Sequence, residues 1–396
     1  MFNLSIGSLY FAAFMLLGPV LLRNNFKYRK YVFLIMNMMV FIGAVKYPLQ
    51  VVVAAVWVMA PYVLMKLCPK KKGIVITGLV CVFAYLMKYD VIFNSLRIPY
   101  VFPWKILGLS YFLFRQIDFI MQYEYLISDD CEAEVNLTDY INYIMSFWTL
   151  LAGPIQRYED FVLDFHKEKE PVSRDELLTN LNRGINGYIK VYVFSAIAGY
   201  YAKLWFESIT HHSTPLLTVL AFVIFAFFNG WYIYFNFSGY CDVVISFAKL
   251  SGFNIKENFN RPYLSRSVVE FWNRHHITLS EWIRDYIYSP LFKAFISGPF
   301  REKIKAGQYL ALFLTFTIAG IWHGTDLNYL IYGLFQGLGI VVATSFRDRL
   351  KKKIGKKGLK KYDANKWIGA VEICVTWMYI CLTFSFVGYD VVGLFR

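Results

Sequence analysis

Long apolar segments recur along this chain, and short basic clusters separate them. A helix needs about 20 apolar residues to cross a hydrocarbon layer about 30 Å thick. Most of the apolar segments are close to that length and carry at most one charge. The pattern therefore predicts about eleven membrane spans. They are residues 5–22, 31–45, 49–65, 73–88, 105–122, 140–153, 184–205, 215–237, 308–322, 326–345 and 367–388, of which 140–153 is short enough to re-enter the membrane instead of crossing it.

Backbone groups in lipid must form their hydrogen bonds within the protein, and a helix satisfies this requirement within one segment. We therefore expect an all-α fold, a polytopic transmembrane helical bundle in which re-entrant or amphipathic helices line a central tunnel. Composition agrees with a membrane protein, because 57% of the residues are hydrophobic and 17% are charged, against about 25% charged in soluble domains. No linker or repeat divides the chain, so a single membrane-embedded domain over residues 1–396 is expected.

The formal net charge of +14 is concentrated in a few clusters. The run from Arg347 to Lys366 holds ten basic and two acidic residues. Basic residues of short loops stay in the cytoplasm and lie against anionic lipid, so this run predicts a cytoplasmic loop. No groove-reading module accompanies it, and we expect membrane lipids and no nucleic acid as partners.

The widest hydrophilic interruption runs from Asn254 to Arg284. From Ser267 onward apolar residues recur at steps of three and four, which predicts an amphipathic helix. In one continuous helix Trp272, His276 and Ser280 share a stripe, whereas His275 points about 100° away and is the weaker candidate. By spacing alone, His276 is either a hydrogen-bonded structural histidine or a catalytic one.

His323 lies between two long apolar segments, in the sequence GIWHG. An ionisable residue at membrane depth is costly and suggests function. The alternative is an interfacial histidine at a short turn with Gly324 and Thr325. The six cysteines show no metal-ligand spacing, and no metal site is expected.

At these residues the chain resembles the membrane-bound O-acyltransferase family. The resemblance rests on FSGYCDVVISFAKLSGFNIKENFNRPYLSRSVVEFWNRHHITLSEWIRDYIYSPL followed by GIWHG, with LGLSYFLFRQIDF and LLAGPIQRYEDF upstream, and it covers roughly residues 105–337. Among bacterial branches it is similar to alginate and other polysaccharide O-acetylases. The teichoic-acid D-alanyl transfer proteins share FWNRxH and IWHG, but that branch is expected to lack an acid at Asp242, which favours O-acetylation.

The resemblance implies that His323 is the catalytic histidine, buried in a tunnel, and that His276 is the second polar residue of the site. An imidazole with a pKa near 6.5 suits a general base that takes the proton of an attacking hydroxyl. His276 or Asn273 would donate a hydrogen bond to the developing oxyanion.

Other polar and aromatic residues of the motifs are expected to line the substrate site: Trp272, Arg274, Asp242 and Trp322. Arg274, Arg284 and Asp285 have an alternative structural role, as partners of one another within the hydrophilic lining, and either Arg274 or Arg266 could instead meet a donor phosphate. Asp242 has the alternative of orienting a neighbour or capping a helix.

The resemblance also implies the reaction partners. The acyl donor would be a thioester, acetyl-CoA or an acyl carrier protein, used as a substrate with no tightly bound cofactor. A separate extracytoplasmic transferase would receive the acyl group, and the chain would reside in the bacterial inner (cytoplasmic) membrane. A transporter and a non-catalytic scaffold are the alternatives; inverted half-repeats, which would favour a transporter, are not visible in the sequence.

Overall fold

The computed structural model describes residues 17–23, 26–44, 48–87, 108–128, 130–150, 152–211, 214–324 and 326–395. Within these ranges the chain is helical and contains no strand; its only extended pairing is an isolated bridge between Phe259 and His275. The predicted all-α class is confirmed. Two compact units divide the chain: residues 1–188 with 240–256, and residues 189–239 with 257–396. We call them unit 1 and unit 2.

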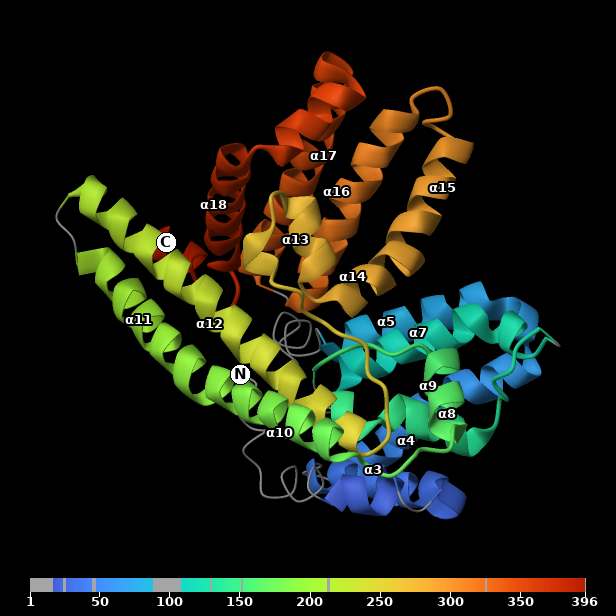
Figure 1. Cartoon of the computed structure of the whole chain (residues 1–396). Helices are drawn as coiled ribbons and strands as arrows, with labels where there is room; N and C mark the ends of the chain where they lie inside the picture. Colours follow the sequence, from blue (N-terminus) through green and yellow to red (C-terminus); the bar gives the residue numbers. More distant parts are fainter. Residues whose placement is uncertain are drawn as a thin grey trace, which may run out of the picture. The chain divides into compact units, whose positions relative to one another are not determined.

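Unit 1 contains α3 (Arg29–Ala44), α4 (Pro48–Leu67), α5 (Lys72–Met87), α7 (Leu109–Leu126), α8 (Leu137–Met145) and α9 (Tyr158–His166), together with α10 (Arg174–Ile189) up to residue 188 (Figure 1). Asp118 of α7 is fully buried and connects three of these helices. Its carboxylate accepts hydrogen bonds from the Tyr143 hydroxyl at 2.9 Å, the Arg157 guanidinium at 2.9 Å and the Tyr158 backbone at 2.8 Å. A buried charge needs such partners, and here they fix α7 to α8 and α9.

Unit 2 carries most of the predicted chemistry. It contains α11 (Ser195–Ser208), much of α12 (Pro215–Leu250), α13 (Val268–Arg274), α14 (Ile277–Ile283), α15 (Ser289–Ser297), α16 (Ile304–His323), α17 (Leu327–Ala364) and α18 (Lys366–Phe384). In Figure 1 α16, α17 and α18 lie side by side. The backbones of α16 and α17 meet at two glycines: a Cβ added at Gly320 would lie 2.5 Å from the Gly333 Cα.

Four described helices are long and apolar enough to cross a membrane: α12, α16, α17 and α18. A fifth span is possible if the bent pair Val51–Leu67 and Pro69–Phe83, with an angle of 120°, is counted as one. The predicted count of about eleven is therefore not confirmed. The predicted span 140–153 is not one helix, because α8 ends at Met145 and a short 3-10 turn follows over Phe147–Thr149. The predicted first span, 5–22, lies mostly outside the described residues.

The basic run after residue 346 connects the apolar part of α17 to α18, and most of its residues are helical. Its predicted cytoplasmic location stays a prediction. The run is not one continuous helix, because two helical segments meet at a kink at Gly355, with φ +67° and ψ 178°. The kink brings Asp363 back beside Arg347. The run's two acidic residues are already paired, Asp348 with Lys305 at 2.7 Å and Asp363 with Arg347 at 2.5 Å. Its lysines therefore form a cationic end of the α16–α17 pair.

Candidate active site

The histidine block does not form one helix. α13 ends at Arg274, His275 is extended (φ −118°, ψ 128°), and His276 adopts a left-handed conformation (φ +48°, ψ 50°) before α14 begins. The predicted stripe of Trp272, His276 and Ser280 depended on a continuous helix, so that interpretation was wrong. The argument that His275 points away from the site depended on the same helix and loses its basis.

A segment that precedes the block holds the break in place. The Asn260 backbone N–H donates to the Arg274 carbonyl at 2.9 Å, and the Ile277 N–H donates to the Asn258 carbonyl at 3.1 Å. The Asn258 side chain is fully buried. Its Oδ1 accepts from the Thr278 backbone N–H at 3.1 Å and from the Thr278 hydroxyl at 2.9 Å. These bonds replace the helical ones that are lost at the break.

His276 is 8% exposed, and its Nδ1 lies 3.3 Å from Asn258 Oδ1. Because the Thr278 donors identify that atom as the amide oxygen, the histidine nitrogen is the donor and carries the proton. Burial, and then the neighbouring histidines, hold the pKa of His276 well below its usual range. His276 is therefore a neutral imidazole whose Nε2 carries a lone pair and no proton. This tautomer does not suit the predicted role of oxyanion donor.

His275 is 5% exposed and sits among aromatic rings. Its ring stacks on Phe271 with centroids 4.7 Å apart, and the edges of Phe259 (5.0 Å) and Phe384 (5.5 Å) surround it. Burial, and next the proximity of His323, lower the pKa of His275 to about 3. Its Nδ1 is buried without a hydrogen-bond partner among the described residues.

His323 is the last residue of α16, and the extended Gly324 ends the helix. Its ring lies 4.5 Å from that of Trp322 and 5.7 Å from that of Tyr332. The Tyr332 ring in turn contacts Phe384, 5.7 Å away, so His323 and His275 share an aromatic wall. His323 remains accessible, unlike the other two histidines. A side chain that lines a tunnel is accessible too, so the predicted tunnel position of His323 stays a prediction.

Polar side chains join α13 to α17 and α18. Trp272 Nε1 donates to Gln336 Oε1 at 3.0 Å, and Gln336 Nε2 donates to the Thr383 hydroxyl at 2.6 Å. All three side chains are buried. Trp272 thus belongs to the packing that holds α13 against α17 and α18. It also lies beside His275 in the candidate site, with 5.8 Å between the ring centroids.

The other predicted residues of the block lie nearer the surface of unit 2. Asn273 is exposed. Arg284 and Asp285 pair at 3.1 Å, as the structural alternative expected, whereas Arg274 pairs with Glu270 at 2.6 Å. Arg266 donates to Glu372 at 2.6 Å and to the Asp363 carbonyl at 2.6 Å. Arg266 and Arg274 each pair with an acidic side chain of unit 2.

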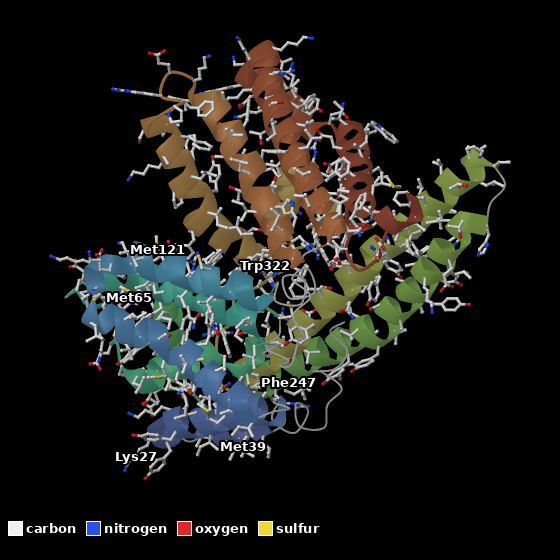
Figure 2. All side chains as sticks on the ribbon, turned by 180° about the vertical axis from the view of Figure 1, so that it is seen from behind. Lys27, Met39, Met65, Met121, Phe247 and Trp322 are labelled. Atoms are coloured by element: carbon white, nitrogen blue, oxygen red, sulfur yellow. The ribbon has the colours of Figure 1, made fainter. Side chains whose placement is uncertain are left out.

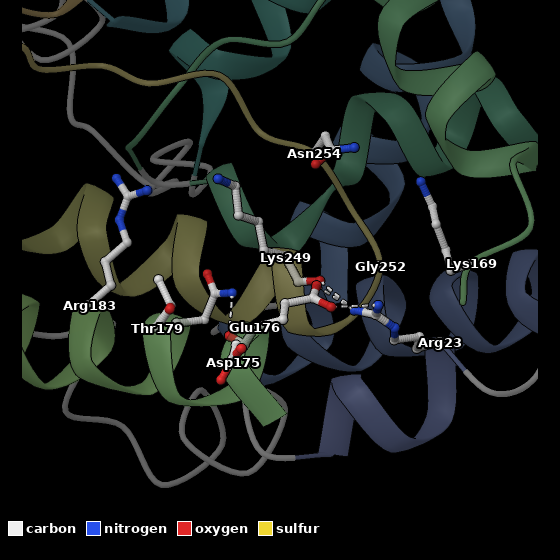
Figure 3. A pocket seen from close by; sticks show the side chains of 10 residues that line it. Arg23, Lys169, Asp175, Glu176, Thr179, Arg183, Lys249, Gly252 and Asn254 are labelled. Atoms are coloured by element: carbon white, nitrogen blue, oxygen red, sulfur yellow. Dashed lines mark hydrogen bonds and ion pairs between the residues drawn. The ribbon is translucent and has the colours of Figure 1, made fainter. Parts of the chain in front are cut away.

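Asp242 belongs to unit 1, where it lies 2.9 Å from Arg183. Arg183 also lines a cavity of about 520 Å³ in unit 1, shown in Figure 3. At one side of this cavity Arg23 pairs with Glu176 at 2.9 Å and donates to the carbonyl of Glu170 at 2.8 Å. Because most of the cavity's cations are engaged in such pairs, we interpret it as a polar junction between the start of unit 1 and α10.

Sequence reasoning missed Asn258, Tyr332, Gln336 and Thr383. Gln336 carried a signal, because it is a polar residue within an apolar span. The roles of Asn258, Tyr332 and Thr383 depend on which elements meet in the folded chain. Among the described residues, no group of three histidine, cysteine or acidic side chains is arranged to hold a metal ion.

The fold and the histidine cluster define a helical membrane protein with an imidazole at the end of a spanning helix. Residues 105–388 match the membrane-bound O-acyltransferase family. The teichoic acid D-alanyltransferase of Bacillus subtilis is 28% identical over 282 residues, 70% of this chain and 67% of that protein. That of Streptococcus thermophilus is 29% identical over 288 residues, again 70% and 67%. A probable alginate O-acetylase of Pseudomonas aeruginosa is 32% identical over 237 residues, 60% of this chain and 42% of that protein.

The chain belongs to the membrane-bound O-acyltransferase family, and it is an acyltransferase. It matches about two thirds of the length of the two teichoic acid relatives and less than half of the alginate relative.

Proposed function

We propose that this protein transfers an acyl group, acetyl in the first instance, from a cytoplasmic thioester to a hydroxyl, for O-acylation of an extracytoplasmic polysaccharide or cell-wall polymer. The observation that carries the proposal is the accessible imidazole of His323 beside two buried neutral histidines. The donor, acetyl-CoA or an acyl carrier protein, is a substrate. The inner membrane as the location and a separate extracytoplasmic transferase as the partner belong to the same proposal.

In the proposed reaction the acceptor hydroxyl attacks the thioester carbonyl carbon, and its proton passes to His323. A carbon–oxygen bond forms, the carbonyl becomes an oxyanion, and the carbon–sulfur bond then breaks as the thiolate takes the proton. A positioned base contributes about 10² to 10⁴ in rate. His276 accepts a hydrogen bond at Nε2 and orients the hydroxyl or the imidazole of His323. Trp322 and Trp272 provide apolar surface beside the reacting group.

An acceptor outside the cell is supported by the helix that carries His323. α16 has 20 residues, and at 1.5 Å per residue it is about 30 Å long, the thickness of the hydrocarbon layer. His323 is at its C-terminal end, whereas the cationic end of α17 is at the other. Figure 2 labels Trp322 at the lower end of the orange and brown helices, and several long side chains with nitrogen tips project from the upper end of the same helices. A cytoplasmic basic end therefore puts His323 near the outer surface.

Transfer of D-alanyl groups for teichoic acid is the second candidate. The observation that favours it is the length of the match, which covers 67% of the two teichoic acid relatives and 42% of the alginate relative. The acidic residue at position 242 favours acetyl transfer under the resemblance described above, and its pairing with Arg183 gives it a structural role compatible with either acyl group.

Mass spectrometry of the surface polymers from cells with and without this chain tests the proposal. O-acetyl esters that disappear with the chain and return with the wild-type protein support the first candidate. D-alanyl esters that follow the same pattern support the second. Polymers whose acylation is identical in all three strains contradict both.

A further inference from the structure

We propose that His275 is a catalytic residue, the hydrogen-bond donor to the thioester carbonyl oxygen as it becomes an oxyanion. The inference rests on the proposed acyl transfer and assigns the donor that the reaction requires. The motif made His276 the preferred histidine, but the geometry of the break distinguishes the two side chains.

His276 and His275 differ in whether a ring nitrogen is left to donate a hydrogen bond. His276 uses its N–H on Asn258 Oδ1, and Thr278 donors occupy the same oxygen. Only a lone pair remains on its ring, so as a neutral imidazole it offers no second donor. His275 has no such engagement, because its Nδ1 has no partner among the described residues.

The side chain of His275 lies in aromatic surroundings. A buried polar group without a hydrogen bond costs free energy, and most such groups in native proteins are explained by function or a bound molecule. Around His275 the neighbours are the rings of Phe271, Phe259, Trp272 and Phe384. A phenylalanine would fit this surrounding without any unsatisfied atom. A buried imidazole nitrogen at this position is therefore explained if it forms a hydrogen bond with a ligand.

His275 lies near His323, the proposed base. His323 and His275 share the Tyr332–Phe384 wall, and His323 is near enough to influence His275 electrostatically. Neither imidazole donates to the other among the described residues. In the reaction, the attacking hydroxyl and the carbonyl must lie between the base and the oxyanion donor. Two neighbouring histidines without a mutual hydrogen bond suit that arrangement.

The experiment compares three substitutions of the full-length protein in detergent or nanodiscs, with kcat and KM measured by transfer of a radiolabelled acyl group. His275→Phe keeps an aromatic ring, His275→Asn keeps a polar atom near the position of Nδ1, and His275→Gln keeps one near Nε2. We expect His275→Phe and His275→Gln to lower kcat about 100-fold or more with little change in KM. His275→Asn should recover at least tenfold over His275→Phe.

Tyr263→Phe is the matched control, because it removes a polar atom from the same block, and its ring packs on Trp231 and Tyr234 instead of the histidines. It should retain wild-type kcat. His275→Phe with kcat within threefold of wild type, or recovery by His275→Gln and not by His275→Asn, would overturn the assignment.

Unfolding midpoints separate this proposal from the proposed function. His275→Phe should unfold at the same or a higher temperature than the wild type, because it removes an unsatisfied buried atom. A lower midpoint would mean that the imidazole has a structural role, and would overturn the inference whether or not transfer is observed. Absence of transfer by the wild type from every thioester tested, with the midpoint of His275→Phe raised, would contradict the proposed function alone.

Discussion

His276 has a backbone conformation that residues other than glycine seldom adopt, with φ +48°. Such a conformation costs about 1–2 kcal/mol for a residue with a Cβ. It is maintained by the bonds of Asn258, which reach the backbone and side chain of Thr278 and the ring of His276. Local strain of this kind persists where the surroundings overdetermine it, and it concentrates at functional sites.

Replacement of Asn258 with alanine should therefore disturb both stability and activity. Three hydrogen bonds to a fully buried amide are lost, so we expect a loss of about 1–3 kcal/mol in the free energy of unfolding. Urea or thermal unfolding in detergent measures it. Asn273→Ala is the control, since Asn273 is exposed on the same block, and its stability should stay within about 0.5 kcal/mol of wild type. Equal losses for the two variants would contradict the role of Asn258.

For single residues, the sequence indicated several side chains that the structure places at or beside the histidines. His276, Trp272 and Trp322 were singled out, and each lies in a ring contact with a histidine or beside one. The tautomer of His276 was beyond reach, because it depends on a contact with Asn258 that only the folded chain makes. The missing partner of His275 Nδ1 likewise depends on which side chains surround it. The ion-pair partner of Arg274 could not be predicted either, because it depends on which acidic side chain lies close in the folded chain.

The α16–α17 pair depends on helices that approach at their backbones. A Cβ at Gly320 would meet the Gly333 Cα at 2.5 Å, and a Cβ at Gly333 would meet the Gly320 Cα at 2.9 Å. Small residues permit this approach between membrane helices. The crossing lies one turn from His323 and one residue from Tyr332, so it sets the distance between these two rings.

Gly320→Ala should push α16 away from α17. Added atoms in a packed interface cost about 1–3 kcal/mol, and His323 should move with its helix, so acyl transfer should fall as well. Gly78→Ala in α5 is the control, because nothing lies within 4 Å of its Cβ position; an alanine there should stabilise a helix by about 0.5–1 kcal/mol. Thermal unfolding of both variants decides the matter. A Gly320→Ala protein as stable as Gly78→Ala would contradict the close crossing.

Element prediction succeeded where periodicity and length agreed. The segments 308–322 and 367–388 correspond to α16 and α18 almost in full. It failed at the histidine block, because an apolar repeat at steps of three and four is compatible with one helix or with two that meet at a turn. His275 and His276 give no local sign of a break; pairing with residues 258–260 imposes it. After residue 346 charge predicted a loop, and the chain there forms two helical segments that meet at a kink at Gly355.

For the molecule as a whole, the account requires that the two ends of the α16–α17 pair face opposite sides of the membrane. α17 crosses about 30 Å between Leu327 and Arg347, at 1.5 Å per residue. The cationic end should be cytoplasmic, and the turn at Asp326 should be accessible from outside. Lipid or an anionic partner on the cytoplasmic side would neutralise the lysines.

Single cysteines at the two ends test this orientation. Arg349→Cys should react with a membrane-impermeant maleimide only in inside-out vesicles, and Asp326→Cys only in intact cells. The background should lack Cys68, Cys81, Cys131 and Cys374, whereas Cys241 and Cys381 are buried and remain. Labelling of both positions from one side would contradict the topology, and with it the proposed location of the acceptor.

The central claim is that His323 is the base of an acyl transfer, and the most direct measurement is the transfer rate of purified His323→Ala protein with a radiolabelled thioester donor. The account predicts a loss of about 10² to 10⁴ in kcat, with expression and unfolding midpoint unchanged, since His323 is accessible and ends its helix. Transfer within threefold of the wild-type rate by a folded His323→Ala protein would contradict it.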